Sequence, residues 1–323
     1  MSKPQGYGKE LSQQQLTMLS KGGLTPDLFH PSYIHMHPIA DVDSYFSDEE
    51  EQSFAEFVDI GKRNPNALGT GRWKLNKKRN KILCLNLSKT AWDISFKSQL
   101  TEFISKYIGL DVDCKEFVDC YDLNKKTLVL DGFEYQLRIL TSNAKRNGRK
   151  KQRMQSPIVD VFSLFDALTY SAISPYISIL AIIDCHLGEK DEEESGSDTL
   201  SEVMGRACGD RVCCVSSISC NNMRSIIATS VHELLHTIGF DHCNSWRCVM
   251  NAQQTEENSI FLSPVNLYKL KYFHNKQHDE LFIRQRYENM LNTQLIKHHP
   301  DFTSDKEWII EKLRLMPQII TIN

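Results

Sequence analysis

The chain lacks a hydrophobic segment long enough to cross a bilayer. Its longest largely apolar run covers residues 177–183, whereas a membrane-spanning helix needs roughly 20 such residues. Its first residues, Met1 to Gly6, also lack the apolar core of a secretory signal. We therefore expect an intracellular, cytoplasmic protein without a membrane partner, and leave a nuclear location open.

A marked charge excess is missing as well. The net charge is −3 at pH 7 and 24% of the residues are charged, so no general attraction to nucleic acid or to anionic lipid is expected. The 10 cysteines are spread over 323 residues without the close spacing of a small disulfide scaffold. This usage indicates thiols in a reducing compartment.

The bulk composition is that of a packed enzyme domain, with 41% hydrophobic residues. Residues 1–75 show only short helical patterns, so we interpret them as an N-terminal extension. Residues 76–323 then form the catalytic domain, with a small, mostly helical subdomain from about residue 243.

Hydrophobic patterns alternate between strands and helices after residue 80. Buried strands are expected at Lys81–Leu87, 177–184 and 212–215, further strands at 117–121 and 135–140, and helices at 90–108 and 159–169. This alternation predicts an α/β fold (α+β by some schemes) with a mixed, mostly parallel sheet covered on both faces.

The run from His232 to Cys243 reads HELLHTIGFDHC. On a helix, residues four apart share one face, so His232 and His236 can both turn a ring nitrogen toward one ion. His242 becomes the third ligand if the helix ends after His236, and Gly239 can take the left-handed conformation that ends a helix. Three histidines leave the fourth position of a catalytic zinc to water.

Glu233 directly follows the first of these histidines. A carboxylate in this place can take a proton from the water, while the zinc lowers the pKa of that water to about 7 and polarises the scissile carbonyl. The sequence therefore predicts peptide hydrolysis with Glu233 as the general base.

Beyond His242 the sequence continues as Cys243-x4-Cys248-x-Met250. This extension resembles the archaemetzincin branch of the metzincin metallopeptidases. The resemblance implies that Met250 forms the turn beneath the zinc ligands. It also implies an edge strand near residues 203–207 that borders the substrate cleft, and an aminopeptidase-like activity on peptides or small proteins.

Archaemetzincins also bind a second, structural zinc through four cysteines, of which Cys243 and Cys248 would be two. The other two positions hold Tyr268 and Lys271 here, which makes the second zinc doubtful. Two interpretations remain open for Cys208, Cys213, Cys214 and Cys220. These cysteines either complete a rearranged zinc site or are small buried hydrophobic residues.

Two further features lie outside the zinc motif. Ser304 and Glu307 have the spacing of a capping box for a C-terminal helix. The basic run Lys145–Arg153 is either a nuclear import signal or anion-binding patch, or a solvated loop.

The reading favoured by these observations is a zinc metallopeptidase. The alternative is a catalytically inactive zinc-binding interaction protein, which the missing pair of cysteines motivates. The presence of Glu233 argues against this alternative, because a protein that only binds zinc needs no general base beside the metal.

Overall fold

The computed structural model describes residues 13–23, 51–63, 75, 79–140, 157–170, 176–192, 198–208, 211–252, 259–274 and 279–316. The chain forms two compact units. The sheet unit comprises Leu75–Ser105 and Gly109–Ile238, and the helical unit comprises Met1–Lys74, Lys106–Ile108 and Gly239–Asn323. The division at residue 75 into an extension and a catalytic domain stays a prediction.

The sheet unit is built on a five-stranded sheet in the order β11-β12-β8-β1-β2. All neighbouring pairs are parallel except β11 with β12, so the predicted mixed, mostly parallel α/β fold is confirmed. Its strands are β1 (Lys81–Leu87), β2 (Asp111–Glu116), β8 (Tyr176–Ile183), β11 (Gly205–Cys208) and β12 (Val212–Ser216). β1, β8 and β12 are buried almost throughout, as expected of strands covered on both faces.

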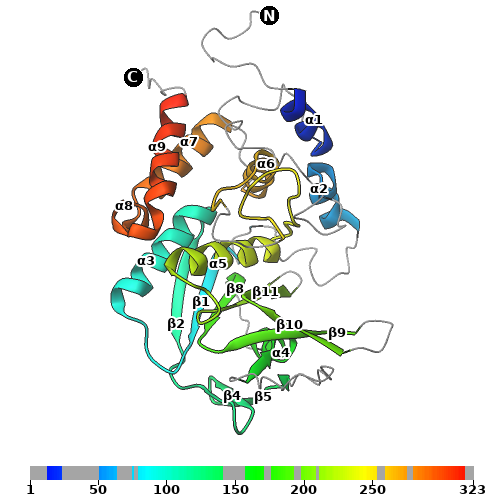
Figure 1. The fold of residues 1–323 in the computed structure, drawn as a ribbon, viewed down its shortest axis with the longest axis vertical. Coiled ribbons are helices and arrows are strands. Elements are labelled where there is room, and N and C mark those ends of the chain that lie inside the picture. The colour runs from blue at the N-terminus through cyan, green and yellow to red at the C-terminus, as the bar shows by residue number, and fades with distance from the viewer. Residues whose placement is uncertain are drawn as a thin grey trace, which may run out of the picture. The chain divides into compact units, whose positions relative to one another are not determined.

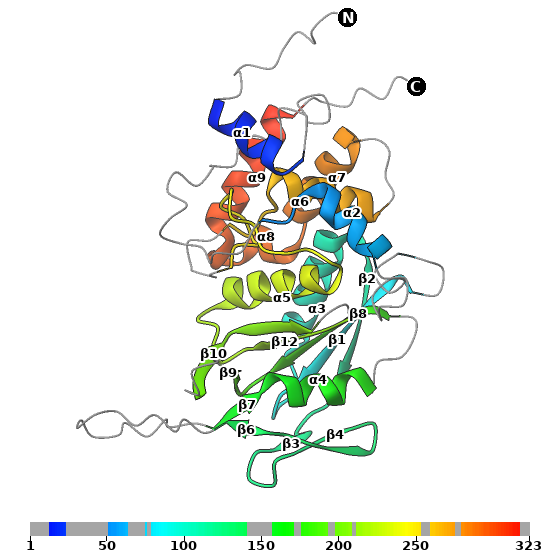
Figure 2. The same cartoon turned by 90° about the vertical axis from the view of Figure 1, so that its right-hand side faces the viewer.

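Helices cover both faces of this sheet (Figures 1 and 2). They are α3 (Ile94–Ile104), which continues as a π-helical turn over Ser105–Gly109, α4 (Val161–Tyr170) and α5 (Met223–Thr237). α5 contacts β12, β11 and β8, and α3 contacts β2 and α5. Figure 2 shows α4 on the opposite face of the sheet.

Two small sheets complete the sheet unit. One has the order β10-β9-β7-β6 and the other β3-β4-β5. Their strands are β3 (Tyr121–Asp122), β4 (Thr127–Leu130), β5 (Phe133–Gln136), β6 (Ile139–Leu140), β7 (Ile158–Asp160), β9 (His186–Glu192) and β10 (Asp198–Val203). Of the two further strands expected, the one at 117–121 was wrong and the one at 135–140 was correct only in part. Residues 117–120 connect two strands, and 135–140 contains parts of two strands that belong to different sheets.

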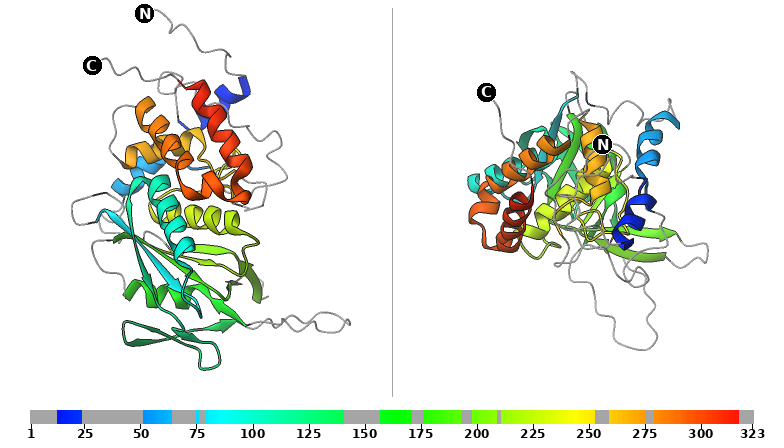
Figure 3. Two further views of the ribbon diagram at one scale, coloured as in Figure 1. Left: turned by 90° about the vertical axis from the view of Figure 1, so that its left-hand side faces the viewer. Right: turned by 90° about the horizontal axis from the view of Figure 1, so that it is seen from above.

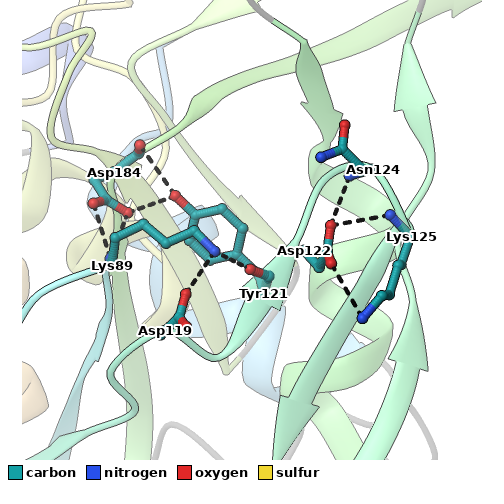
Figure 4. A network of polar contacts seen from close by, with 7 residues as sticks. All are labelled: Lys89, Asp119, Tyr121, Asp122, Asn124, Lys125 and Asp184. Carbon is teal, nitrogen blue, oxygen red and sulfur yellow. Dashed lines mark hydrogen bonds and ion pairs between the residues drawn. The ribbon is translucent and has the colours of Figure 1, made fainter.

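A polar network joins one small sheet to the carboxyl ends of β1 and β8 (Figure 4). Asp184 accepts hydrogen bonds from the Lys89 backbone at 2.9 Å and from the Tyr121 hydroxyl at 2.7 Å. The Lys89 ammonium group pairs with Asp119 at 2.8 Å and donates to the Tyr121 carbonyl. Open parallel sheets often bind ligands at this edge, but here these groups bind one another, so we assign the network a structural role.

The helical unit contains the C-terminal helices α6 (Pro264–Phe273), α7 (Asp279–Leu291), α8 (Gln294–His298) and α9 (Thr303–Leu315), which Figure 3 shows grouped in orange and red. Phe261 stacks on Trp308 with ring centroids 3.8 Å apart. Arg286 donates to the Tyr107 carbonyl at 3.0 Å, and the Tyr107 hydroxyl donates to Ile260 at 2.7 Å. All regular elements described after residue 243 are helices, as the sequence predicts.

Two N-terminal helices belong to the same unit, α1 (Gln13–Lys21) and α2 (Phe54–Arg63). α2 contacts α6. In the part of the chain that the structure describes, no helix combines the length and apolarity that a membrane span requires. The basic run Lys145–Arg153 lies outside the described residues.

Candidate metal centre

Helix α5 carries the first two histidines and is fixed at both ends. The Asn222 side chain accepts from the Ser225 backbone at 2.8 Å and caps the N-terminus. Near the C-terminus, the Thr237 hydroxyl pairs with Ser178 of β8. The helix ends at Thr237, and Gly239 follows with φ 93°. Gly239 therefore ends the helix in the left-handed conformation, as predicted.

The three histidines come together at one point. The ligand nitrogens of His232, His236 and His242 all lie within 4.8 Å of one another, and the Nε2 atoms of His232 and His236 are 3.0 Å apart. Two nitrogens bound tetrahedrally to zinc at 2.0–2.1 Å would be about 3.3 Å apart. The chemistry and spacing of this donor set therefore fit a single zinc ion.

Glu233 is 6% exposed, which is unusual for an acidic side chain. Burial raises the pKa of its carboxyl group to about 8, while the charge of Arg206 lowers it and that of Glu189 raises it. A bound cation would favour the ionised form of this carboxyl group.

Strand β11 lies against the helix that carries Glu233, and Gly205 permits the close approach. A Cβ atom at Gly205 would lie 2.7 Å from Thr229 Cγ2, 2.9 Å from Glu233 Cγ and 3.1 Å from the Cys214 carbonyl oxygen. The archaemetzincin resemblance implies the edge strand, but Gly205 was not predicted as a site residue, because a glycine in a strand more often marks a bulge.

Arg206 is the next residue of the same edge strand. Its Nε is 3.1 Å from Glu189 Oε2 of β9, so the two charged groups that shift the pKa of Glu233 form an ion pair with each other. Sequence reasoning missed this pair as well, since the two residues are far apart in the chain and belong to no motif.

Solved structures that are similar to this chain include two archaemetzincins. One is the archaemetzincin of Methanopyrus kandleri, with 19% identity and a TM-score of 0.39 over 62% of this chain and 99% of that chain. The other is the archaemetzincin of Archaeoglobus fulgidus complexed with malonate, with 15% identity and a TM-score of 0.34 over 58% of this chain and 99% of that chain. No protein-family model and no curated protein matches the sequence.

Both structures bear the family name that the motif from His232 to Met250 suggests. The likeness is distant, and the assignment of a metal centre rests on the three histidines themselves.

The loop after His242 is tied together by Asn251. Its side-chain amide donates to the carbonyls of Cys243 at 2.6 Å and Trp246 at 2.7 Å, and its oxygen accepts from the Cys248 backbone at 2.9 Å. Met250 is fully buried, and its carbonyl accepts from the Cys243 backbone at 2.7 Å. The role of Met250 beneath the zinc ligands stays a prediction.

The surroundings of Cys243 and Cys248 do not fit a second zinc. Both thiols are buried, and burial together with the neighbouring Cys248 raises the pKa of Cys243. The buried ammonium group of Lys269 interacts electrostatically with both thiols. A structural zinc at this place would need four ligands instead. Among the described residues, the three histidines form the one group of three or more potential ligands.

The other cysteines do not complete such a site within the described residues. Cys213 and Cys214 are fully buried in β12, Cys220 is buried before α5, and Cys208 is exposed. For Cys213, Cys214 and Cys220 this agrees with the reading as small buried hydrophobic residues.

Proposed function

We propose that this protein is a zinc-dependent metallopeptidase that hydrolyses peptide bonds without a covalent intermediate. The observation that carries the proposal is that His242 comes together with His232 and His236, two residues of the helix on which Glu233 is buried. Zinc in a three-histidine site supplies a Lewis acid that activates water at neutral pH.

The chain's own residues have separate tasks in this mechanism. His232, His236 and His242 would hold the ion through their ring nitrogens. Glu233 takes the proton of the attacking water and passes it to the leaving amine. The burial of Glu233 supports this task, because proton transfer is efficient when the pKa of the base lies near the working pH.

The finer assignments rest on the archaemetzincin resemblance. We propose peptides or small proteins as substrates, with cleavage at the amino end. A peptide would lie along β11, which is an edge strand with one hydrogen-bonded neighbour in its sheet and can accept an added strand.

The test is cleavage of a mixed peptide library by the wild-type protein and by Glu233→Gln at equal zinc content. Glu134→Gln is the matched control, because Glu134 is exposed on β5. We expect Glu233→Gln to lose at least about a hundredfold in rate, the usual contribution of a general base, and the control to cleave normally.

The cut sites then distinguish aminopeptidase from endopeptidase action. If the wild-type protein binds one zinc and yet cleaves nothing, the proposed activity is wrong and the inactive zinc-binding interaction protein becomes the better account.

A further inference from the structure

The third ligand, His242, lies outside regular structure. The helix that holds His232 and His236 ends at Thr237, and residues 240–243 belong to no helix or strand. A metal ligand on such a segment keeps its position only if other contacts hold the backbone on both sides of it.

Those contacts come from Gln52, which is 187 residues away from Gly239. The Gln52 side-chain amide donates to the Gly239 carbonyl at 3.1 Å and to Asp241 Oδ2 at 2.9 Å. Its oxygen accepts from the Asp241 backbone at 3.4 Å. Gln52 therefore binds the residue directly before His242 and the glycine that ends the helix.

Gln52 is itself held in place by a buried cation. Lys269 of α6 donates to the Gln52 side-chain oxygen at 2.9 Å and to its backbone carbonyl at 2.8 Å. Gln52 is 4% exposed and Lys269 1% exposed. Charge-assisted hydrogen bonds between buried groups are strong and directional, so the position of Gln52 is well defined.

Residues close to Gln52 in the sequence make further contacts on both sides of His242. Glu51 accepts hydrogen bonds from the Cys243 thiol at 3.2 Å and from the Ser245 hydroxyl. Before His242 in the chain, Phe240 packs against Phe57 with ring centroids 5.1 Å apart. The segment Glu51–Phe57 thus contacts the chain both before and after His242.

The same segment also covers one of the positions where the archaemetzincin pattern has a cysteine. Tyr268 packs edge-on against Phe54 with centroids 4.6 Å apart, and the Lys271 ammonium group lies 4.6 Å from the centre of the Tyr268 ring. Aromatic packing and a buried lysine therefore occupy the region in which the second zinc does not fit.

We propose that Gln52 is a positioning residue of the metal centre, and that the N-terminal segment Glu51–Phe57 holds the His242 loop in place. The proposal rests on the proposed function, since it assigns a role toward the zinc. It makes the affinity for zinc depend on a residue far outside the histidine motif.

The test compares zinc affinity in the wild-type protein, Gln52→Met and Gln285→Met, by competition with a chromogenic chelator. Methionine keeps the length of glutamine and removes its hydrogen bonds. Gln285 is the matched control, because it is exposed on α7. We expect Gln52→Met to bind zinc about tenfold more weakly, as for outer-shell partners of metal ligands, and Gln285→Met to match the wild type.

Hydrogen exchange of the metal-free proteins supplies a second readout. The peptide spanning Ile238–Cys243 should exchange faster in Gln52→Met. If Gln52→Met fails to fold, Gln52→Glu replaces it, since glutamate keeps an acceptor for Lys269 and loses the amide donor to Gly239 and Asp241. Faster exchange of this peptide in Gln52→Glu supports the proposal.

The following outcomes would contradict the positioning role of Gln52. Wild-type zinc affinity and unchanged exchange in the Gln52 variants overturn the positioning role and leave the proposed function intact. A loss of stability without weaker zinc binding also overturns it, because it shows a purely structural role. If the wild-type protein binds no zinc through the three histidines, both proposals fail.

Discussion

At Glu233 and Gly205 the identity of single residues controls the geometry of the site. Glu233 is a buried carboxylate, and its position depends on a neighbour with no side chain. Any Cβ atom at Gly205 would approach Glu233 Cγ and Thr229 Cγ2 more closely than packed atoms allow. The close approach is therefore a requirement of packing, and it affects the residue that we assign as general base.

Gly205→Ala should accordingly lower both stability and peptide cleavage. Overpacking at a well-packed position costs about 1–3 kcal/mol, and the displacement of Glu233 should reduce kcat more than KM. Urea unfolding and steady-state kinetics measure the two effects.

Gly132→Ala is the control, because a Cβ atom at Gly132 would meet nothing within 4 Å. Gly132 has φ +84°, so this substitution strains the backbone without crowding a neighbour. It should cost about 1 kcal/mol of backbone strain and leave cleavage unchanged. Equal kinetics for the two variants would contradict the proposed role of Gly205.

Helix boundaries show how local signals compete. Asp93 accepts from the backbone of Ser95 and Phe96 at 2.7 and 3.3 Å, so α3 starts at Ile94 and not at the predicted residue 90. The expected capping box of Ser304 and Glu307 was wrong. A 3-10 turn at Pro300–Phe302 leads directly into α9, which begins at Thr303 without a side-chain cap.

In α5 the cap at Asn222 has a measurable consequence. Asn222→Ala should lower the free energy of unfolding by about 1 kcal/mol, because the backbone amide of Ser225 loses its acceptor. Asn222→Asp should retain most of the stability, since aspartate is an equally good cap and its charge suits the N-terminus of a helix. Chemical denaturation of the three proteins checks this. The cap is unimportant if alanine and aspartate behave alike.

On the scale of the whole molecule, the helical unit is assembled from segments that are far apart in the sequence, whereas the sheet unit is nearly continuous. The helical unit combines residues before 75 with residues after 238, and Gln52 and Lys269 meet there. Contacts of this kind hold distant segments of the chain together. Zinc would further restrict the positions of these segments if it binds as proposed.

Zinc should therefore raise the stability of the folded protein. At a free zinc concentration of one thousand times the dissociation constant, the gain is about 4 kcal/mol. Calorimetry should show a higher Tm with zinc than after chelation. His236→Ala should lose this difference, whereas His298→Ala, at an exposed position of α8, should keep it. A zinc-dependent Tm in His236→Ala would place the metal elsewhere.

Much of the candidate site follows from the sequence alone. The spacing of His232 and His236, the glycine at 239 and the third histidine lie within eleven consecutive residues. Helix geometry and one left-handed residue are therefore enough to predict their convergence. The strands β1, β8 and β12 were predicted within a residue or two for a similar reason, because their apolar runs are continuous and short.

Only the tertiary structure revealed Gly205 beside Glu233, the Arg206–Glu189 pair, and the contacts of Gln52 and Lys269 with the His242 loop. Each of these joins residues that are separated by many positions in the chain. Neither side-chain periodicity nor motif spacing carries information about such pairs, since they form only when the folded backbone brings distant segments into contact. Local geometry thus determined where the three histidines converge, and long-range packing decided what holds the backbone around them.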